Sequence, residues 1–76
     1  MTRRSDLKYE CLLCRERFSG GTVANPVEAL VSLGQTRRYE QFNAVILHHC
    51  QDGGIGLARI IGTLPVVVAD DRIVEA

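Results

Sequence analysis

The residues best suited to chemistry in this chain are its three cysteines and two histidines, which fall into two groups. Cys11 and Cys14 are separated by two residues, and His48, His49 and Cys50 follow one another directly. Two cysteines at this spacing can face one ion from a single turn, and zinc completes a tetrahedron with thiolate sulfur and imidazole nitrogen. The two groups together predict one structural zinc ion, because four protein ligands leave no open position for a substrate.

The choice between the two histidines depends on the conformation of the segment before Cys50. In a strand, alternate side chains share a face, so His48 and Cys50 would point together and His49 would point away. We keep His49 as the reserve ligand, and the sequence leaves open whether the ion is zinc or iron. The predicted metal ligands are Cys11, Cys14, His48 and Cys50.

One helix and one strand can be placed around these groups. Asn25 can cap a helix that begins at Pro26, with Glu28 at the third position of a capping box and Gly34 as its end. Residues 36–50 fit a helix or a strand, and we favour a strand over residues 44–50.

The other segments predict short elements. Two short strands are expected to turn between Cys11 and Cys14, with a break at residues 19–21. Residues 57–61 fit a short helix or an apolar loop, and residues 66–74 fit a terminal hairpin.

The size of the chain limits it to one domain. It has 76 residues, of which 46% are hydrophobic, and a core of this size is marginal without a further stabilising element. The expected fold class is α+β, with a metal-binding knuckle, one or two short helices and a C-terminal β-hairpin. Residues 1–76 would form a single zinc-binding domain, with residues 1–6 as a flexible N-terminus.

The charge balance favours a protein partner. Nine basic and nine acidic residues give a formal net charge of zero, whereas nucleic-acid-binding domains usually carry a basic excess. Arginines beside the predicted knuckle and after the predicted helix are the candidate partner-binding residues. They are Arg15, Arg17, Arg37 and Arg38.

The cysteine count indicates a reducing compartment. Three cysteines, an odd number, do not form a complete disulfide framework, and reduced thiols are typical of the cytoplasm. No segment reaches the roughly 18 apolar residues of a membrane span, and the first residues lack the apolar core of a secretory signal. We therefore expect an intracellular, cytoplasmic protein with no membrane partner.

Residues 9–18 resemble the first half of a two-cysteine, two-histidine zinc finger. That family has an aromatic residue two positions before its first cysteine, here Tyr9, and a phenylalanine after its second, here Phe18. The long interval before Cys50 is more similar to treble-clef and zinc-ribbon knuckles, which usually carry a glycine where this chain has Arg15. The resemblance implies a metal-binding knuckle and no particular family.

Residues 62–74 are similar to the proline-led hairpin of thioredoxin and glutaredoxin folds. With the Cys-x-x-Cys near the start of the chain, this resemblance implies a thiol oxidoreductase. Cys11 would be a nucleophile at a helix N-terminus and Cys14 the resolving thiol. The polar segment before Cys11 and the break at residues 19–21 depart from that family.

The expected function is that of a binding module and not of an enzyme. The chain would act as a small zinc protein that regulates or adapts a protein partner in transcription or other nucleic-acid machinery, of the kind encoded by phages and mobile elements. The first alternative is the thiol oxidoreductase with Cys11 and Cys14. The second is direct nucleic-acid binding through the basic N-terminal part. No small-molecule substrate is expected, and the partner's identity and the oligomeric state remain open.

Overall fold

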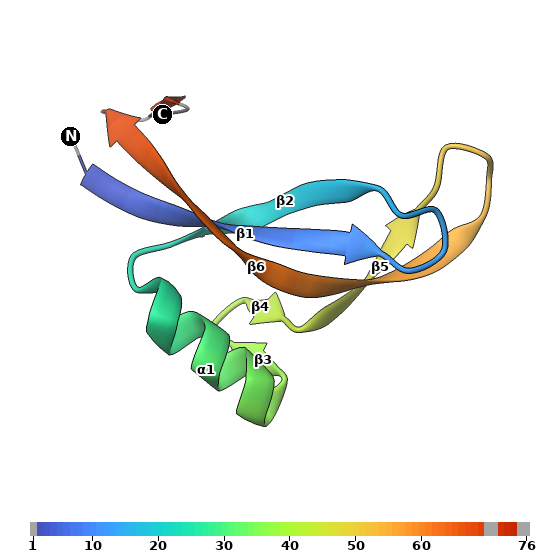
Figure 1. Cartoon of the computed structure of the whole chain (residues 1–76), viewed down its shortest axis with the longest axis horizontal. Helices are drawn as coiled ribbons and strands as arrows, with labels where there is room; N and C mark the ends of the chain where they lie inside the picture. The colour runs from blue at the N-terminus through green and yellow to red at the C-terminus, as the bar shows by residue number, and fades with distance from the viewer. Residues whose placement is uncertain (1, 70–71, 75–76) are drawn as a thin grey trace.

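A computed structural model describes residues 2–69 and 72–74, and in this part of the chain β-strands predominate (Figure 1). The main sheet has five antiparallel strands among the described residues, in the order β2-β1-β6-β5, with β7 paired to β6. A second sheet contains β3 and β4. The elements are β1 (Thr2–Cys11), β2 (Arg17–Val23), α1 (Pro26–Thr36), β3 (Arg38–Tyr39), β4 (Phe42–Asn43), β5 (Val45–His49), β6 (Ile55–Ala69) and β7 (Arg72–Val74).

The expected α+β class is therefore wrong, and β6 accounts for most of the difference. Residues 57–61 were expected to form a helix or loop, and the hairpin was expected to begin only at residue 66. Instead, a single strand runs from Ile55 to Ala69. Within residues 2–69 and 72–74 it is accompanied by one helix only.

Strand pairing explains why β6 continues through residues that usually interrupt strands. Pairing with β5 stops at Arg59 and pairing with β7 begins at Val67. Pro65 lies between these two points, where β1 is the partner of β6. A proline is tolerated where its missing N–H is not needed by a second neighbouring strand.

The strand β1 occupies the centre of the sheet, between β2 and β6. Residues 2–6 belong to this strand and pair with β6, which corrects the expectation of a flexible N-terminus; residue 1 lies outside the described residues. Polar residues are accommodated because the strand alternates. Leu7, Tyr9 and Cys11 are buried, whereas Lys8 and Glu10 are only half-buried. An antiparallel sheet can be covered on one face and solvated on the other.

Two β-bulges bend the sheet near Lys8. The register of β1 shifts against β2 between Leu7 and Lys8, and against β6 between Lys8 and Tyr9. Residues 19–21 therefore belong to β2 and are not a break, because a bulge accommodates the extra residue there. Bulges strengthen the local twist. The sheet curls until its two edge strands meet, since Phe18 of β2 stacks on His48 of β5 with 4.9 Å between ring centroids.

The helix α1 begins as its capping residues predict. The Asn25 side chain accepts a hydrogen bond of 3.1 Å from the Glu28 N–H, and Pro26 is the first helical residue. The helix continues past Gly34 and ends at Thr36, because Arg37 adopts a left-handed conformation with φ of 63° and donates its N–H to the Leu33 carbonyl. No helix in the described ranges is long and apolar enough to cross a membrane.

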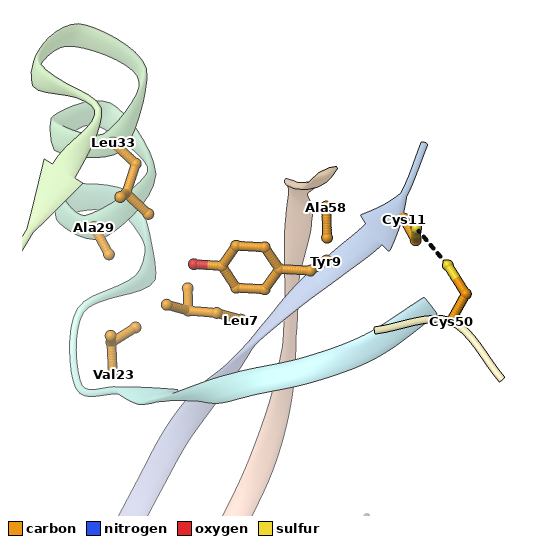
Figure 2. Packing of buried hydrophobic residues seen from close by; sticks show 8 residues of the cluster. All are labelled: Leu7, Tyr9, Cys11, Val23, Ala29, Leu33, Cys50 and Ala58. Atoms are coloured by element: carbon orange, nitrogen blue, oxygen red, sulfur yellow. Dashed lines mark hydrogen bonds between the residues drawn. The ribbon is translucent and has the colours of Figure 1, made fainter. Parts of the chain in front are cut away.

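The buried residues form a cluster that runs from α1 to the end of β1 (Figure 2). Ala29 and Leu33 of the helix cover the end of the sheet that contains Leu7 and Val23. Tyr9 lies in the middle and donates a hydrogen bond of 2.6 Å to the Asn43 carbonyl. At the far end the cluster contains Cys11 and Cys50, and α1 does not cover this end.

Candidate metal centre

Cys11, Cys14, His48 and Cys50 lie together at the end of the sheet that α1 does not cover. Cys11 is the last residue of β1, and Cys14 lies in the turn that follows. His48 is on β5, which is confirmed as a strand at Val45–His49, and Cys50 follows that strand. Because β6 separates β1 from β5 in the sheet, the curl of the sheet is what brings these residues together.

Three of the six separations between the candidate ligand atoms match the edges of a zinc tetrahedron. The Sγ atoms of Cys11 and Cys50 are 3.8 Å apart. His48 Nδ1 is 3.6 Å from Cys14 Sγ and 3.7 Å from Cys50 Sγ. With zinc–sulfur bonds of about 2.3 Å and zinc–nitrogen bonds of about 2.05 Å, a tetrahedron has sulfur–sulfur edges of about 3.8 Å and sulfur–nitrogen edges of about 3.6 Å. All four atoms lie within 4.8 Å of one another, so the group can hold a metal ion.

The turn between β1 and β2 gives the first two cysteines their positions. The Cys11 carbonyl accepts a hydrogen bond of 2.9 Å from the Arg15 N–H, and the Cys11 N–H donates to the Glu16 carbonyl at 2.9 Å. Arg15 has a φ of 68°, which is in the left-handed region. This is the position where metal knuckles usually carry glycine, so the chain keeps the backbone conformation while lacking the residue type that adopts it most easily.

A second turn positions Cys50. The Cys50 N–H donates to the Gly54 carbonyl at 2.8 Å, and the Cys50 carbonyl accepts from Gly53 at 3.1 Å. On β6, Gly56 lies directly against the other side of the site. A Cβ atom at Gly56 would be 2.7 Å from Cys11 Sγ and 2.7 Å from Leu13 Cβ. Glycine at this position is therefore needed for Cys11 to occupy its place.

The two buried thiols differ in acidity. The N–H of Cys14 lowers the pKa of Cys11 to about 6, with help from the Leu13 N–H and from His48, even though burial acts in the opposite direction. Burial raises the pKa of Cys50 to about 12. The hydrogen bond to Cys11 raises the pKa of His48. A metal ion would therefore find one thiolate already formed and would displace a proton from the Cys50 thiol.

Two further residues hold His48, and the sequence did not identify either of them. The Nε2 atom of His48 lies 3.4 Å from the Glu16 carboxylate, and the ring is stacked on Phe18 at an interplanar angle of 16°. A carboxylate on one imidazole nitrogen leaves the other nitrogen free for a metal ion. The contact between Glu16 and His48 joins opposite edges of the sheet, so the sequence does not show it directly. The one sequence signal for Glu16 was its position close to Cys14.

The remaining candidate residues are not part of this group. His49, the reserve ligand, is exposed and lies outside the cluster formed by the other four. Arg15 and Arg17 lie at the β1–β2 turn, whereas Arg37 and Arg38 follow α1, and Figure 1 shows these two regions apart. The four arginines therefore do not form one continuous surface.

The geometry expected for a thioredoxin-like site is not present. Cys11 ends a strand of an antiparallel sheet, and the turn after it leads into β2 and not into a helix. Its pKa is depressed, as that mechanism needs, but its side chain is completely buried. Cys14, in contrast, is exposed.

Comparison of the chain with protein-family models, with curated proteins and with solved structures found no match in any of the three. The site is therefore interpreted from its own geometry. That geometry defines a mostly β domain in which three thiols and one imidazole converge at the open end of a curled sheet.

Proposed function

We propose that the chain is a structural zinc protein, with Cys11, Cys14, His48 and Cys50 as the four ligands. The observation that carries this proposal is the match between three separations in the structure, of 3.8, 3.6 and 3.7 Å, and the edges of a zinc tetrahedron. Zinc is preferred over iron because a mixed shell of thiolates and one imidazole is a common structural zinc shell. The ion would join the end of β1 to the end of β5.

Beyond the metal, we propose a binding role as a regulator or adaptor of a protein partner. Support for this comes from the ligand shell, which leaves no coordination position for a substrate. Placing that partner in transcription or other nucleic-acid machinery is an analogy with other small zinc proteins.

Elemental analysis of the purified chain tests the metal proposal. We expect one zinc ion per chain in the wild type and in His49→Ala, which is the matched control, and loss of zinc in His48→Ala. Replacement of zinc by cobalt should give the visible absorption of a tetrahedral cobalt–thiolate site in the wild type and in His49→Ala, and not in His48→Ala.

A folded wild-type protein that contains no metal when purified and takes up no zinc when zinc is added would overturn the proposal. Equal zinc content in His48→Ala and the wild type would also reject His48 as a ligand. Iron in place of zinc would keep the site and change its metal.

A further inference from the structure

The outer face of the sheet, opposite the metal centre, has a row of exposed leucines. Leu47 of β5 pairs with Leu57 of β6, and the Leu57 carbonyl accepts a hydrogen bond from the Leu12 N–H at the end of β1. The three side chains are 67%, 52% and 43% exposed, respectively. Val45 and Ile55 extend this row along β5 and β6 and are also exposed. Large contiguous patches of exposed aliphatic side chains mark interaction sites.

The same face continues into a hollow beyond the leucines. Along β6, Leu57, Arg59 and Ile61 are exposed, while Ala58 between them is buried, so the three share the outer face. The hollow has a volume of about 370 Å³, which lies within the range of about 300 to 1,000 Å³ that is usual for binding pockets. It is lined by Lys8, Arg17, Ile61, Gly62, Thr63 and Leu64.

The charge that this face presents is positive. Arg17 pairs with Glu10, but the arginine side chain is 72% exposed and the glutamate 18%. Lys8 pairs with Asp6, and here the exposed fractions are 33% and 11%. In both ion pairs the cation is more exposed than the carboxylate, and Arg59 is a second exposed cation besides Arg17.

The area of the face argues against a second copy of the chain as its occupant. Four strands about 4.8 Å apart, over the length of the five residues of β5 at about 3.3 Å each, cover about 300 Å². A standard interface buries about 800 Å² on each partner. Two copies would also bring the same exposed cations together.

We propose that this outer face, defined by Leu12, Leu47, Leu57, Ile61, Arg17 and Lys8, binds a short segment of a partner protein that carries aliphatic and acidic side chains. The aliphatic side chains would cover the leucine row and the hollow, and the carboxylates would meet Arg17 and Lys8. This inference rests on the proposed binding role and names its surface and the chemistry of its partner.

A random peptide library displayed on phage and selected against the zinc-loaded full chain tests the inference. We expect the selected peptides to be rich in aspartate, glutamate and aliphatic residues. Fluorescence anisotropy with the synthesised peptides should show affinity losses of about tenfold or more for Leu57→Lys and for Arg17→Glu. Val31→Lys and Gln35→Glu, at two exposed positions of α1, are the controls and should bind as the wild type does.

Several results would overturn the inference. One is a selection that yields no binding peptide, and another is a set of selected peptides rich in basic residues. A third is equal affinity of the peptides for Leu57→Lys, Arg17→Glu and the wild type. A dimer in sedimentation equilibrium that Leu57→Lys abolishes would assign the face to a second copy. Zinc content and circular dichroism of every variant show whether it still binds zinc and is still folded. If a folded chain without zinc binds the peptides, the docking surface is supported and the metal proposal is not.

Discussion

His48 lies between groups that decide which of its two ring nitrogens faces the thiols. Its Nε2 atom faces the Glu16 carboxylate at 3.4 Å, and its Nδ1 atom lies within 3.7 Å of the sulfur atoms of Cys14 and Cys50. Stacking on Phe18 fixes the plane of the ring. The imidazole is thus oriented before any metal ion arrives, which reduces the entropy lost on binding.

Removal of the Glu16 carboxylate should weaken metal binding. We expect Glu16→Ala to lower zinc affinity by about 10- to 100-fold, the usual effect of losing such a partner of a ligating histidine. Glu16→Gln should lose less, because its amide oxygen can still accept the Nε2–H. Competition with a coloured chelator measures these affinities, and Glu40→Gln, at an exposed glutamate beyond α1, is the control. Equal affinity in Glu16→Ala and the control would show that Glu16 does not position the ring.

Titration of the metal-free protein should reveal that the Cys11 thiol is acidic. Because the Cys11 pKa is lowered from 9.0 to about 6, thiolate absorbance in the ultraviolet should rise near pH 6 in the wild type. The rise should be absent in Cys11→Ser and unchanged in Cys50→Ser, because the Cys50 thiol keeps its proton up to about pH 12. A first rise only near pH 9 would contradict the assignment.

The lowered pKa of Cys11 also predicts that the stability of the metal-free protein depends on pH. A thiol with a lower pKa in the folded chain than in the unfolded chain stabilises the fold above the unfolded value, here pH 9.0, and loses that contribution as the pH falls through about 6. Urea unfolding of metal-free wild type and Cys11→Ser at both ends of this range should show the difference. The two proteins should differ more at high pH than below pH 6.

At the scale of elements, β6 approaches the candidate metal centre so closely that one of its residues has no room for a side chain. Gly56 faces Cys11, and a Cβ atom added to Gly56 would lie only 2.7 Å from Cys11 Sγ. Gly34, in contrast, lies in α1, and a Cβ atom there would have no neighbour within 4 Å. The two glycines therefore differ in what they contribute, although neither has a side chain.

Substitution of the two glycines by alanine should have opposite effects. Gly56→Ala should destabilise the fold by about 1 to 3 kcal/mol, the usual cost of overpacking, and should weaken zinc binding by displacing Cys11. Gly34→Ala should stabilise the fold by about 0.5 to 1 kcal/mol, since alanine favours helix. Urea denaturation measures both values. Equal effects of the two substitutions would mean that Gly56 has more space than its distances indicate.

The elements that the sequence predicted correctly have local signals. Asn25 and Pro26 mark the start of α1, and the β-branched apolar run before Cys50 marks β5. The strand β6 was not recognised because Gly56, Gly62 and Pro65 oppose a strand when they are considered alone. Its conformation depends on β1, a distant segment, and tertiary pairing overrides local propensity.

The same distinction applies to the candidate site. Cys11, Cys14, His48 and Cys50 were grouped correctly because thiols and imidazoles are rare and their spacing is informative. Glu16 and Phe18 were missed as partners of His48, because glutamate and phenylalanine have many roles and this contact exists only when the sheet curls.

The whole molecule measures 39 × 28 × 16 Å and is stabilised differently at its two ends. At one end α1 covers the sheet with Ala29 and Leu33. At the other end the sheet closes over thiols and an imidazole. In the absence of a covering helix, a metal ion is the element that would add stability there, as in other chains of this size.

Stability should therefore depend on the concentration of free zinc. A ligand that binds only the folded chain adds about 1.4 kcal/mol to the unfolding free energy for each tenfold rise above its dissociation constant. Urea unfolding in zinc buffers should show this slope for the wild type and for His49→Ala, and no dependence for His48→Ala. A flat response in the wild type would mean that zinc is not part of the fold.

The pairing of β1 with β6 also determines when the chain can fold during its synthesis. Thr2 pairs with Val68 and Cys11 with Ala58, so β1 must wait for partners that are synthesised 47 to 66 residues later. Contacts between segments so distant in sequence form slowly. During that interval the Cys11 thiol is exposed on the nascent chain and accessible to oxidants and to free metal ions, until β6 is synthesised and Cys11 becomes buried.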